Sequence, residues 1–547
     1  MSPVDKGVYV TKLKSFGGLE SNESLPEKSN DDENENDEAK PIRWEDSTYW
    51  SNAQPSISMP SHSDETALQS DIKTLPEIFY VNIISVPSLQ PSEQVPRSLS
   101  LIISNLYVFI MRLRQGLLFF GTQLCSHMVE AVSTYNGTEN SSVPIYPLSS
   151  DNYFTFVLTE TLALANGGGS ATSEVLRLAS QIVPGDFDGW FSEYDWMGDQ
   201  MYSLAQRAKT SISKRGALFR AASYWRLSGF FLTGNASDPR LYEKWDLGLD
   251  AFSEAISLLP VPGENHTISG PEYSIPYYFY KASQCNEKLP TIVVGTGYDG
   301  PQQDVWHQLG QEATSRGYNF VTYEGPGQPT VRRHDNIGFM PNWWDVVTPI
   351  VDEISSRADV DMDKLAYIGV SFGGELAPRV ASREHRFKAV ISIDGLVDMQ
   401  EAILSQLSEE LFEAFESQNA TLFDEAITYA LSVPPRNTEF TWVTGQGLWS
   451  FNTTSYYAWL TQLGTFKVTQ ELVNNITTPY LFVAEGEDDS LARGQPLALV
   501  SLYENATHPL NTTYYRFPTN LGAGEHCQLG AEPQLAQEVY DWLYGIL

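Results

Sequence analysis

A serine between two glycines is the arrangement in this sequence that most directly predicts chemistry. Residues 369–373 read Gly-Val-Ser-Phe-Gly, directly after an apolar run at 365–368 and before a helix-compatible stretch at 375–382. The flanking glycines permit a turn too sharp for larger residues, and such a strand-to-helix turn projects the serine hydroxyl from the edge of a parallel sheet. Ser371 is therefore the predicted nucleophile.

A serine nucleophile needs a general base. In doubly wound enzymes with such a turn, the partners follow in the order serine, acid, histidine, each on a later loop at the same sheet edge. Of the eight histidines, only His508 and His526 follow a candidate acid loop. His508 lies between two N-glycosylation motifs, as expected of a surface loop, whereas His526 lies in a glycine-rich turn before the last helix. His526 is the predicted base.

The acid should follow the predicted strand at residues 480–484. There the chain reads Glu-Gly-Glu-Asp-Asp, and Asp489 lies three residues past Gly486, the common offset for this loop. We therefore choose Asp489 over Asp488 and Glu487. Its expected role is to fix the imidazole tautomer and to stabilise the imidazolium.

The oxyanion formed by attack on a carbonyl needs two aligned N–H donors. The residue after the nucleophile, Phe372, supplies one. The other should come from the loop at residues 295–300, after the first core strand, where Tyr298 is the predicted donor and Asp299 the alternative.

The elements that must position these residues have the pattern of an α/β fold. Short apolar runs alternate with helical stretches after residue 274, and this alternation predicts a doubly wound, mostly parallel sheet. The predicted strands are residues 291–294, 319–322, 365–370, 389–393 and 480–484.

Two helical regions accompany the predicted sheet. Helical periodicity before residue 260 predicts an all-helical N-terminal domain, and a helical, aromatic stretch interrupts the sheet pattern as a cap over the catalytic edge. The predicted boundaries are 132–272 for the helical domain, 273–399 for the first part of the core, 400–473 for the cap and 474–547 for the last part of the core.

Aromatic residues of the cap are candidates for binding substrate. Flat rings bury much area at little cost in conformational entropy. Trp442, Trp449 and Tyr456 are the residues chosen, with ordinary packing of the cap as the alternative.

Composition excludes several functions. A net charge of -34 repels phosphate backbones, so nucleic acid is not an expected partner. Three cysteines without a C-x-x-C pair support neither a disulfide framework nor a zinc knuckle, although a bridge from Cys285 to Cys527 stays open. Phosphate-binding glycine loops and H-E-x-x-H are absent. We expect no metal and no cofactor.

The N-terminal part reads as a leader followed by a targeting signal. Residues 1–110 are acidic and polar and predict disorder, and they have the character of a gene-model artefact or an isoform extension. Residues 111–131 combine two arginines, a short apolar run and a small residue, Ala131, as in a signal peptide. The apolar runs are shorter than the roughly 20 residues of a membrane span.

Ten N-x-S/T motifs accompany this signal-like segment, nine of them after residue 131. Together these features predict secretion and N-glycosylation. A cytoplasmic location is the alternative if the leader is genuine.

These motifs as a set resemble the α/β-hydrolase superfamily. Within it they are similar to the group that contains 2,6-dihydroxypseudooxynicotine hydrolase and fungal polyketide chain-shortening hydrolases. The motifs that carry the resemblance are residues 220–226 (RAASYWR), 238–240 (DPR), 294–300 (VGTGYDG), 323–328 (YEGPGQ), 369–379 (GVSFGGELAPR), 494–496 (GQP) and 525–528 (EHCQ). Where relatives often have an acidic pair after the oxyanion loop, this chain has Gln302, Gln303 and Asp304.

The resemblance implies a serine hydrolase without metal or cofactor, and some relatives cleave a C–C bond beside a ketone. We expect a bulky aromatic or polyketide-like carbonyl substrate, bound between the N-terminal helices and the cap. A carboxylesterase or lactonase uses the same triad, and a peptidase or a non-catalytic binding protein on this scaffold are further alternatives. The sequence leaves the oligomeric state open, a homodimer included.

Overall fold

The computed structural model describes residues 146–285 and 287–547. The predicted leader (1–110) and the signal-like segment (111–131) lie outside the described residues, as do residues 132–145. Within the described ranges, no helix is both long and apolar enough to cross a bilayer.

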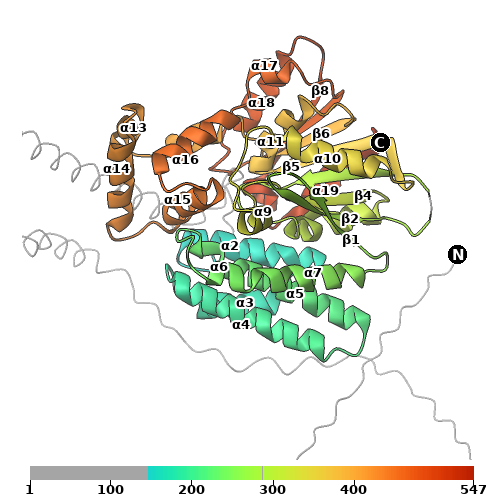
Figure 1. Ribbon diagram of the computed structural model, residues 1–547, viewed down its shortest axis with the longest axis horizontal. Helices are drawn as coiled ribbons and strands as arrows, with labels where there is room; N and C mark the ends of the chain where they lie inside the picture. Colours follow the sequence, from blue (N-terminus) through green and yellow to red (C-terminus); the bar gives the residue numbers. More distant parts are fainter. Residues whose placement is uncertain (1–145, 286) are drawn as a thin grey trace, which may run out of the picture. The chain divides into compact units, whose positions relative to one another are not determined.

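The first described elements are helices (Figure 1). Side chains cap three of them: Asp151 accepts a hydrogen bond from the N–H of Phe154, Asp186 from that of Gly189 and Thr210 from that of Ser213. The helices are α2 (Asn152–Ala163), α3 (Thr172–Gln181), α4 (Phe187–Gln206), α5 (Ser211–Ser228), α6 (Arg240–Glu243) and α7 (Trp245–Ser257), with a 3-10 turn η2 (Phe230–Leu232) after α5.

An eight-stranded sheet follows, in the order β1-β2-β4-β3-β5-β6-β7-β8. The first two strands pair antiparallel with each other and β2 pairs antiparallel with β4, whereas all other pairs are parallel. The predicted doubly wound, mostly parallel sheet is therefore confirmed. The strands are β1 (Glu264–Ser269), β2 (Ser274–Tyr280), β3 (Leu289–Gly295), β4 (Asn319–Tyr323), β5 (Val360–Val370), β6 (Ala389–Ile393), β7 (Tyr480–Gly486) and β8 (Asn511–Phe517).

Strand β1 lies inside the range predicted as helical, 132–272. The helices end at Ser257, and the sheet begins at Glu264, so the predicted boundary falls within the hairpin of β1 and β2. Every second side chain of β1 is exposed at this sheet edge, so the strand is mostly polar and lacks the apolar signal of a buried strand.

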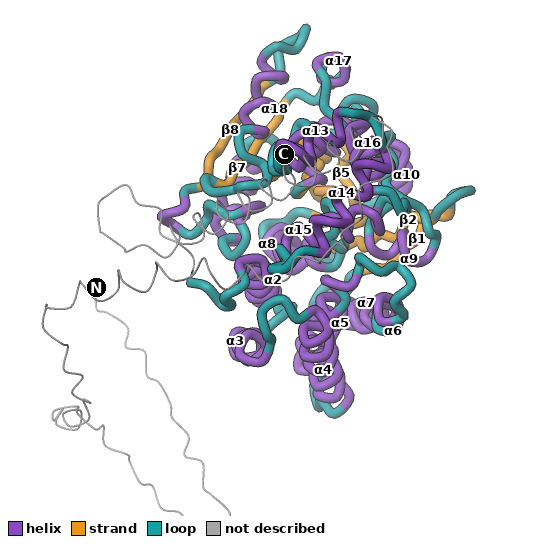
Figure 2. The backbone as a smooth tube through the Cα atoms, turned by 90° about the vertical axis from the view of Figure 1, so that its left-hand side faces the viewer, coloured by secondary structure: helices purple, strands orange, loops and turns teal. Residues whose placement is uncertain are grey.

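Helices cover both faces of the sheet, and Figure 2 shows the strands flanked by them. Alternation along β5 divides its side chains: Ala366 and Ile368 join the core shared with the N-terminal helices and α19, whereas Leu365 and Tyr367 join the core shared with α10, α11 and α18. The helices that connect the strands include α8 (Gln311–Ser315), α9 (Pro329–His334), α10 (Trp344–Ser355), α11 (Phe372–Ala381) and α18 (Gln495–Glu504), and α19 (Glu532–Tyr544) follows the last strand.

The stretch between β6 and β7 is helical, as predicted for the cap. Its helices are α12 (Met399–Leu404), α13 (Glu409–Glu416), α14 (Ala420–Ser432), α15 (Thr438–Ser450), α16 (Tyr456–Leu463) and α17 (Gln470–Val473).

Candidate active site

The predicted nucleophile lies at a strained turn between β5 and α11. Ser371 has φ 62 and ψ -126, in the positive-φ region that a residue other than glycine rarely adopts. The turn is too tight for side chains at its flanks, because a Cβ on Gly369 would lie 1.9 Å from the carbonyl oxygen of Gly373. The Ser371 N–H donates to the carbonyl of Ile393 at 3.0 Å, which ties the turn to the end of β6. The geometry is that of a nucleophile elbow.

The predicted base and acid lie beside this serine. His526 Nε2 is 2.8 Å from Ser371 Oγ, and His526 Nδ1 is 2.6 Å from Asp489 Oδ2. The other oxygen of Asp489 accepts hydrogen bonds from the N–H groups of Leu491 and Ala492 at 2.9 and 3.0 Å. These two bonds fix the orientation of the carboxylate. The structure thus joins the three predicted residues in one chain of hydrogen bonds.

The alternatives to these residues lie elsewhere. Asp488 is exposed and contributes only its backbone N–H, which donates to the carbonyl of Gly524. Glu487 is exposed and accepts from the N–H of Thr519. His508 contacts the carbonyl of Ile476.

Electrostatics of the histidine and the acid are linked. Burial lowers the pKa of His526, but the charge and hydrogen bond of Asp489, together with Cys527, raise it well above its usual value. Burial also favours the neutral form of Asp489, yet the imidazole and two backbone N–H groups hold the pKa of that carboxyl below its usual range. The arrangement stabilises an imidazolium, the state a general base reaches when it accepts a proton.

The loop that carries the predicted donor Tyr298 runs beside the other predicted donor, Phe372. A Cβ added to Gly297 would be 2.9 Å from the Phe372 nitrogen, so this loop runs directly beside that N–H. Gln328 donates to the carbonyl of Gly297 at 3.3 Å. Because C=O and N–H point in opposite directions across a trans peptide, the Tyr298 N–H faces away from Gln328. The carbonyl of Tyr298 accepts from Gln446 of the cap at 3.1 Å.

The three aromatic candidates do not share one place. Trp442 on α15 approaches the oxyanion loop, with its ring 6.2 Å from that of Tyr298, and it stacks on Phe230 at 5.0 Å. Its third neighbour is Tyr153 on α2, at 5.2 Å. This aromatic cluster of Trp442, Tyr298, Phe230 and Tyr153 joins the cap, the core and the N-terminal helices.

The other two candidates pack away from the oxyanion loop. Trp449 is buried with Leu232 and Leu241, and the guanidinium of Arg333 lies 4.8 Å from its ring. Tyr456 is half-buried on α16, where burial and nearby Asp424 raise the pKa of its phenol. Within the described residues, neither ring pairs with the imidazole of His526 or with the ring of Tyr298.

A charged cluster that sequence reasoning missed borders the oxyanion loop. Arg226 on α5 pairs with Glu160 at 2.9 Å and with Asp304, the one acidic residue of the stretch Gln302-Gln303-Asp304. Asp299 lies next to them, and burial together with the charge of Glu160 raises its pKa to about 6. The second arginine of RAASYWR, Arg226, and the acid after the oxyanion loop, Asp304, are the sequence signals for this cluster.

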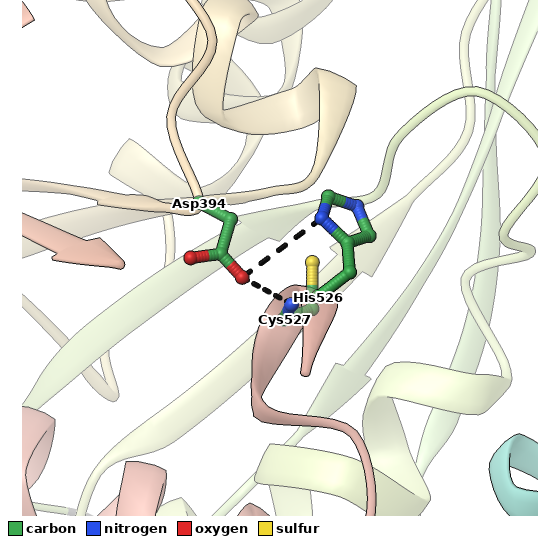
Figure 3. Close-up of side chains that lie close together, drawn as sticks. All are labelled: Asp394, His526 and Cys527. Atoms are coloured by element: carbon green, nitrogen blue, oxygen red, sulfur yellow. Dashed lines mark hydrogen bonds and ion pairs between the residues drawn. The ribbon is translucent and has the colours of Figure 1, made fainter. Parts of the chain in front are cut away.

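One group of side chains has the donor types of a metal site. Oxygen, nitrogen and sulfur atoms of Asp394, His526 and Cys527 lie within 4.8 Å of one another (Figure 3). These donors do not fit a metal, because both oxygens of Asp394 accept N–H hydrogen bonds and His526 Nδ1 is bonded to Asp489. Burial also raises the pKa of the Cys527 thiol to about 11, which disfavours the thiolate that binds metals. Cys285 and Cys527 are both free, so the bridge that the sequence left open does not form.

Comparisons with known proteins agree with this fold. Residues 345–446 match the prolyl oligopeptidase family. The chain is 28% identical to hydrolase acrC of Aspergillus aculeatus over 283 residues, which are 47% of this chain and 64% of acrC. It is 26% identical to hydrolase LUC6 of Fusarium sp over 410 residues (72% of this chain and 96% of LUC6). It is 27% identical to 20-hydroxy-prefusarin hydrolase FUS2 of Gibberella moniliformis over 320 residues (56% and 75%).

Among solved structures, 2,6-dihydroxy-pseudo-oxynicotine hydrolase superposes with a TM-score of 0.54 at 17% identity, over 70% of this chain and 95% of that one. The resemblance drawn from the sequence is thereby confirmed. The chain has the α/β-hydrolase fold and is related to fungal hydrolases.

Proposed function

From this α/β-hydrolase fold and its fungal relatives, we propose that the chain is a serine hydrolase that uses Ser371, His526 and Asp489. The observation that carries the proposal is the unbroken series of hydrogen bonds from Ser371 Oγ through His526 to Asp489, at 2.8 and 2.6 Å. A non-catalytic binding protein has no need of this geometry or of the strain at the serine, which argues against that alternative.

The reaction begins with proton transfer and attack on a carbonyl. His526 Nε2 takes the proton of Ser371 Oγ as the oxygen adds to the carbonyl carbon of the substrate. The negative oxygen of the tetrahedral intermediate accepts hydrogen bonds from the N–H groups of Phe372 and Tyr298. Asp489 stabilises the imidazolium during this step.

Collapse of the intermediate breaks the bond to the leaving group. His526 returns its proton to the departing atom, an oxygen in an ester or a carbon in a β-diketone, and an acyl group remains on Ser371. Water, deprotonated by His526, then releases the acid and restores the serine.

The substrate in this proposal is a bulky aromatic or polyketide-like carbonyl compound. The aromatic cluster of Trp442, Tyr298, Phe230 and Tyr153 supports it, because Trp442 lies beside Tyr298 of the oxyanion loop and, like Tyr153, is only partly buried. The name of the relative FUS2 indicates an enzyme that acts on 20-hydroxy-prefusarin, a further reason to test such compounds. C–C hydrolysis beside a ketone and hydrolysis of an ester or lactone both use this site.

An activity assay of the purified protein tests the substrate class. The substrates are matched aryl β-diketones and aryl esters, and the products are identified by mass. Faster turnover of aryl than of alkyl substrates is expected, and Trp442→Ala should reduce that preference. Tyr456→Ala is the matched control, because Tyr456 lies on a different cap helix. Turnover confined to short aliphatic esters would refute the aromatic substrate class.

We also propose that the protein enters the secretory route. The asparagines of all seven N-x-S/T motifs within the described residues are exposed. Glycans attached to these side chains would therefore extend into solvent. These asparagines are Asn235, Asn265, Asn419, Asn452, Asn475, Asn505 and Asn511. The signal-like segment that motivates the proposal lies outside the described residues.

A further inference from the structure

The mechanism above leaves one buried carboxyl at the site without a role. Asp394 follows β6, is fully buried and has a positive φ of 46. Such a backbone conformation in a residue other than glycine persists only where the surroundings hold it in place, and it is frequent at functional sites. Ser371 and Cys527 also have a positive φ, of 62 and 56.

Asp394 connects the loop of the acid with the loop of the histidine. Its Oδ1 accepts from the N–H of Gly486, at the end of β7, at 2.8 Å. Its Oδ2 accepts from the N–H of Cys527, and the Gln528 amide donates to both oxygens at 3.2 and 3.1 Å. The carboxyl therefore fixes the backbone on both sides of the site.

Asp394 also faces the catalytic imidazole directly (Figure 3). Its Oδ2 lies 3.9 Å from His526 Nδ1, the nitrogen that contacts Asp489 at 2.6 Å. At 3.9 Å there is no hydrogen bond, but a shift of the ring by about 1 Å would bring the pair within hydrogen-bond distance. Because β6 and β7 are adjacent and parallel, their carboxyl ends present two acids to one histidine.

The charges around Asp394 explain why it does not hydrogen-bond to His526 while Asp489 is present. Burial, followed by the negative charge of Asp489, raises the pKa of Asp394 to about 7. The titratable groups that face it are Asp489 from the loop after β7, His526 and Cys527 from the histidine loop, and Tyr514 from β8. Removal of the Asp489 charge would remove this repulsion and favour an ionised Asp394.

We propose that Asp394 is a second positioning carboxyl of the site, which holds the histidine loop and becomes the partner of His526 Nδ1 when Asp489 is absent. The inference rests on the proposed Ser371 mechanism. It differs from a purely structural role in one respect: loss of Asp394 must cost more when Asp489 is already missing.

The test is a double-mutant cycle on the full chain, read as the second-order rate of labelling by a fluorophosphonate probe. Its variants are Asp394→Asn, Asp489→Ala and the double variant, with Asp488→Asn as the exposed control in the same loop. Asparagine tolerates positive φ, so Asp394→Asn should keep the backbone. Asp394→Gly, which tolerates it equally, replaces this variant if Asp394→Asn does not fold.

We expect Asp394→Asn to slow labelling about tenfold or less in the wild-type background, and about thirtyfold or more in the Asp489→Ala background. The residual activity of Asp489→Ala should also fall as pH drops through the ionisation of Asp394, and the double variant should lose this dependence. Equal fold-losses in both backgrounds would overturn the inference while leaving the proposed function intact. A wild-type protein that is not labelled at Ser371 would instead overturn the proposed function, and the inference with it.

Discussion

Substitution of Gly297 by alanine should block the proposed oxyanion site without changing any catalytic side chain. The backbone of Gly297 lies outside the left-handed region, so conformation alone permits alanine. The added Cβ would lie 2.9 Å from the Phe372 nitrogen, 2.9 Å from Ser371 Cβ and 3.0 Å from the Val370 carbonyl oxygen. Carbon contacts normally lie at about 3.5–4.0 Å, so backbone must move by roughly half an ångström.

Two effects with different magnitudes follow from this clash. Overpacking against backbone should lower the free energy of unfolding by about 1–3 kcal/mol. Displacement of the Phe372 N–H from the oxyanion should slow the reaction about 10² to 10³-fold. Gly300→Ala is the matched control, because its Cβ would meet only the Thr296 side chain, with Cβ at 3.5 Å and Cγ2 at 3.8 Å, which are ordinary contact distances.

Urea unfolding measures the first effect, and the rate of fluorophosphonate labelling measures the second. Gly297→Ala should be less stable in urea and should label more slowly than wild type, whereas Gly300→Ala should match wild type in stability and in labelling rate. A Gly297→Ala protein that is destabilised but labels as fast as Gly300→Ala would refute the oxyanion assignment, because the clash would then affect packing alone.

Three further predictions concern the acid, the base and the route of export. Asp489→Asn should slow labelling by about 10³-fold or more, since the amide favours the wrong imidazole tautomer, whereas Asp488→Asn should leave it unchanged; the reverse order would overturn the acid assignment. Because Asp489 raises the pKa of His526 and the base must be neutral, the rate should rise with pH and level off only well above pH 6.5; a plateau already reached at about pH 6 would contradict this coupling. The native product should begin near Val132 and carry N-glycans, which N-terminal sequencing and glycosidase treatment check; an unglycosylated intracellular protein that retains residues 1–110 would argue against secretion.

The centre of the sheet could be predicted from the sequence because its strands are buried on both faces. All five predicted strands correspond to β3 to β7, where continuous apolar runs give a clear signal. Strands β1, β2 and β8 were not predicted. β1 and β8 lie at the sheet edges, where polar residues such as those of Asn511–Phe517 face solvent. β2 is mostly buried, but it contains Pro276, a residue that weakens a strand pattern. The edges of a sheet are set by pairing with neighbours, which local patterns do not record.

Chain order was enough to bring Ser371, His526 and Asp489 together, because parallel strands place successive loops at one edge. The same rule places Asp394, a polar residue directly after a predicted strand, at this sheet edge, but it does not show that the carboxyl contacts the histidine loop. The aromatic residues were harder to place. Trp442 and Trp449 lie seven residues apart on α15, hence on nearly the same face but about 10 Å apart along the axis, and only the first reaches the oxyanion loop.

The central claim, that Ser371 is a nucleophile activated by His526, is tested most directly by covalent labelling. Wild-type protein should react with a fluorophosphonate and carry the adduct on the peptide that contains Ser371, as identified by mass spectrometry. Ser371→Ala should fold normally, since only a hydroxyl is lost, and should neither label nor turn over substrate, with a rate loss of about 10³-fold or more. Ser371→Ala that retains half of the wild-type labelling, or an adduct on another residue, would contradict the account.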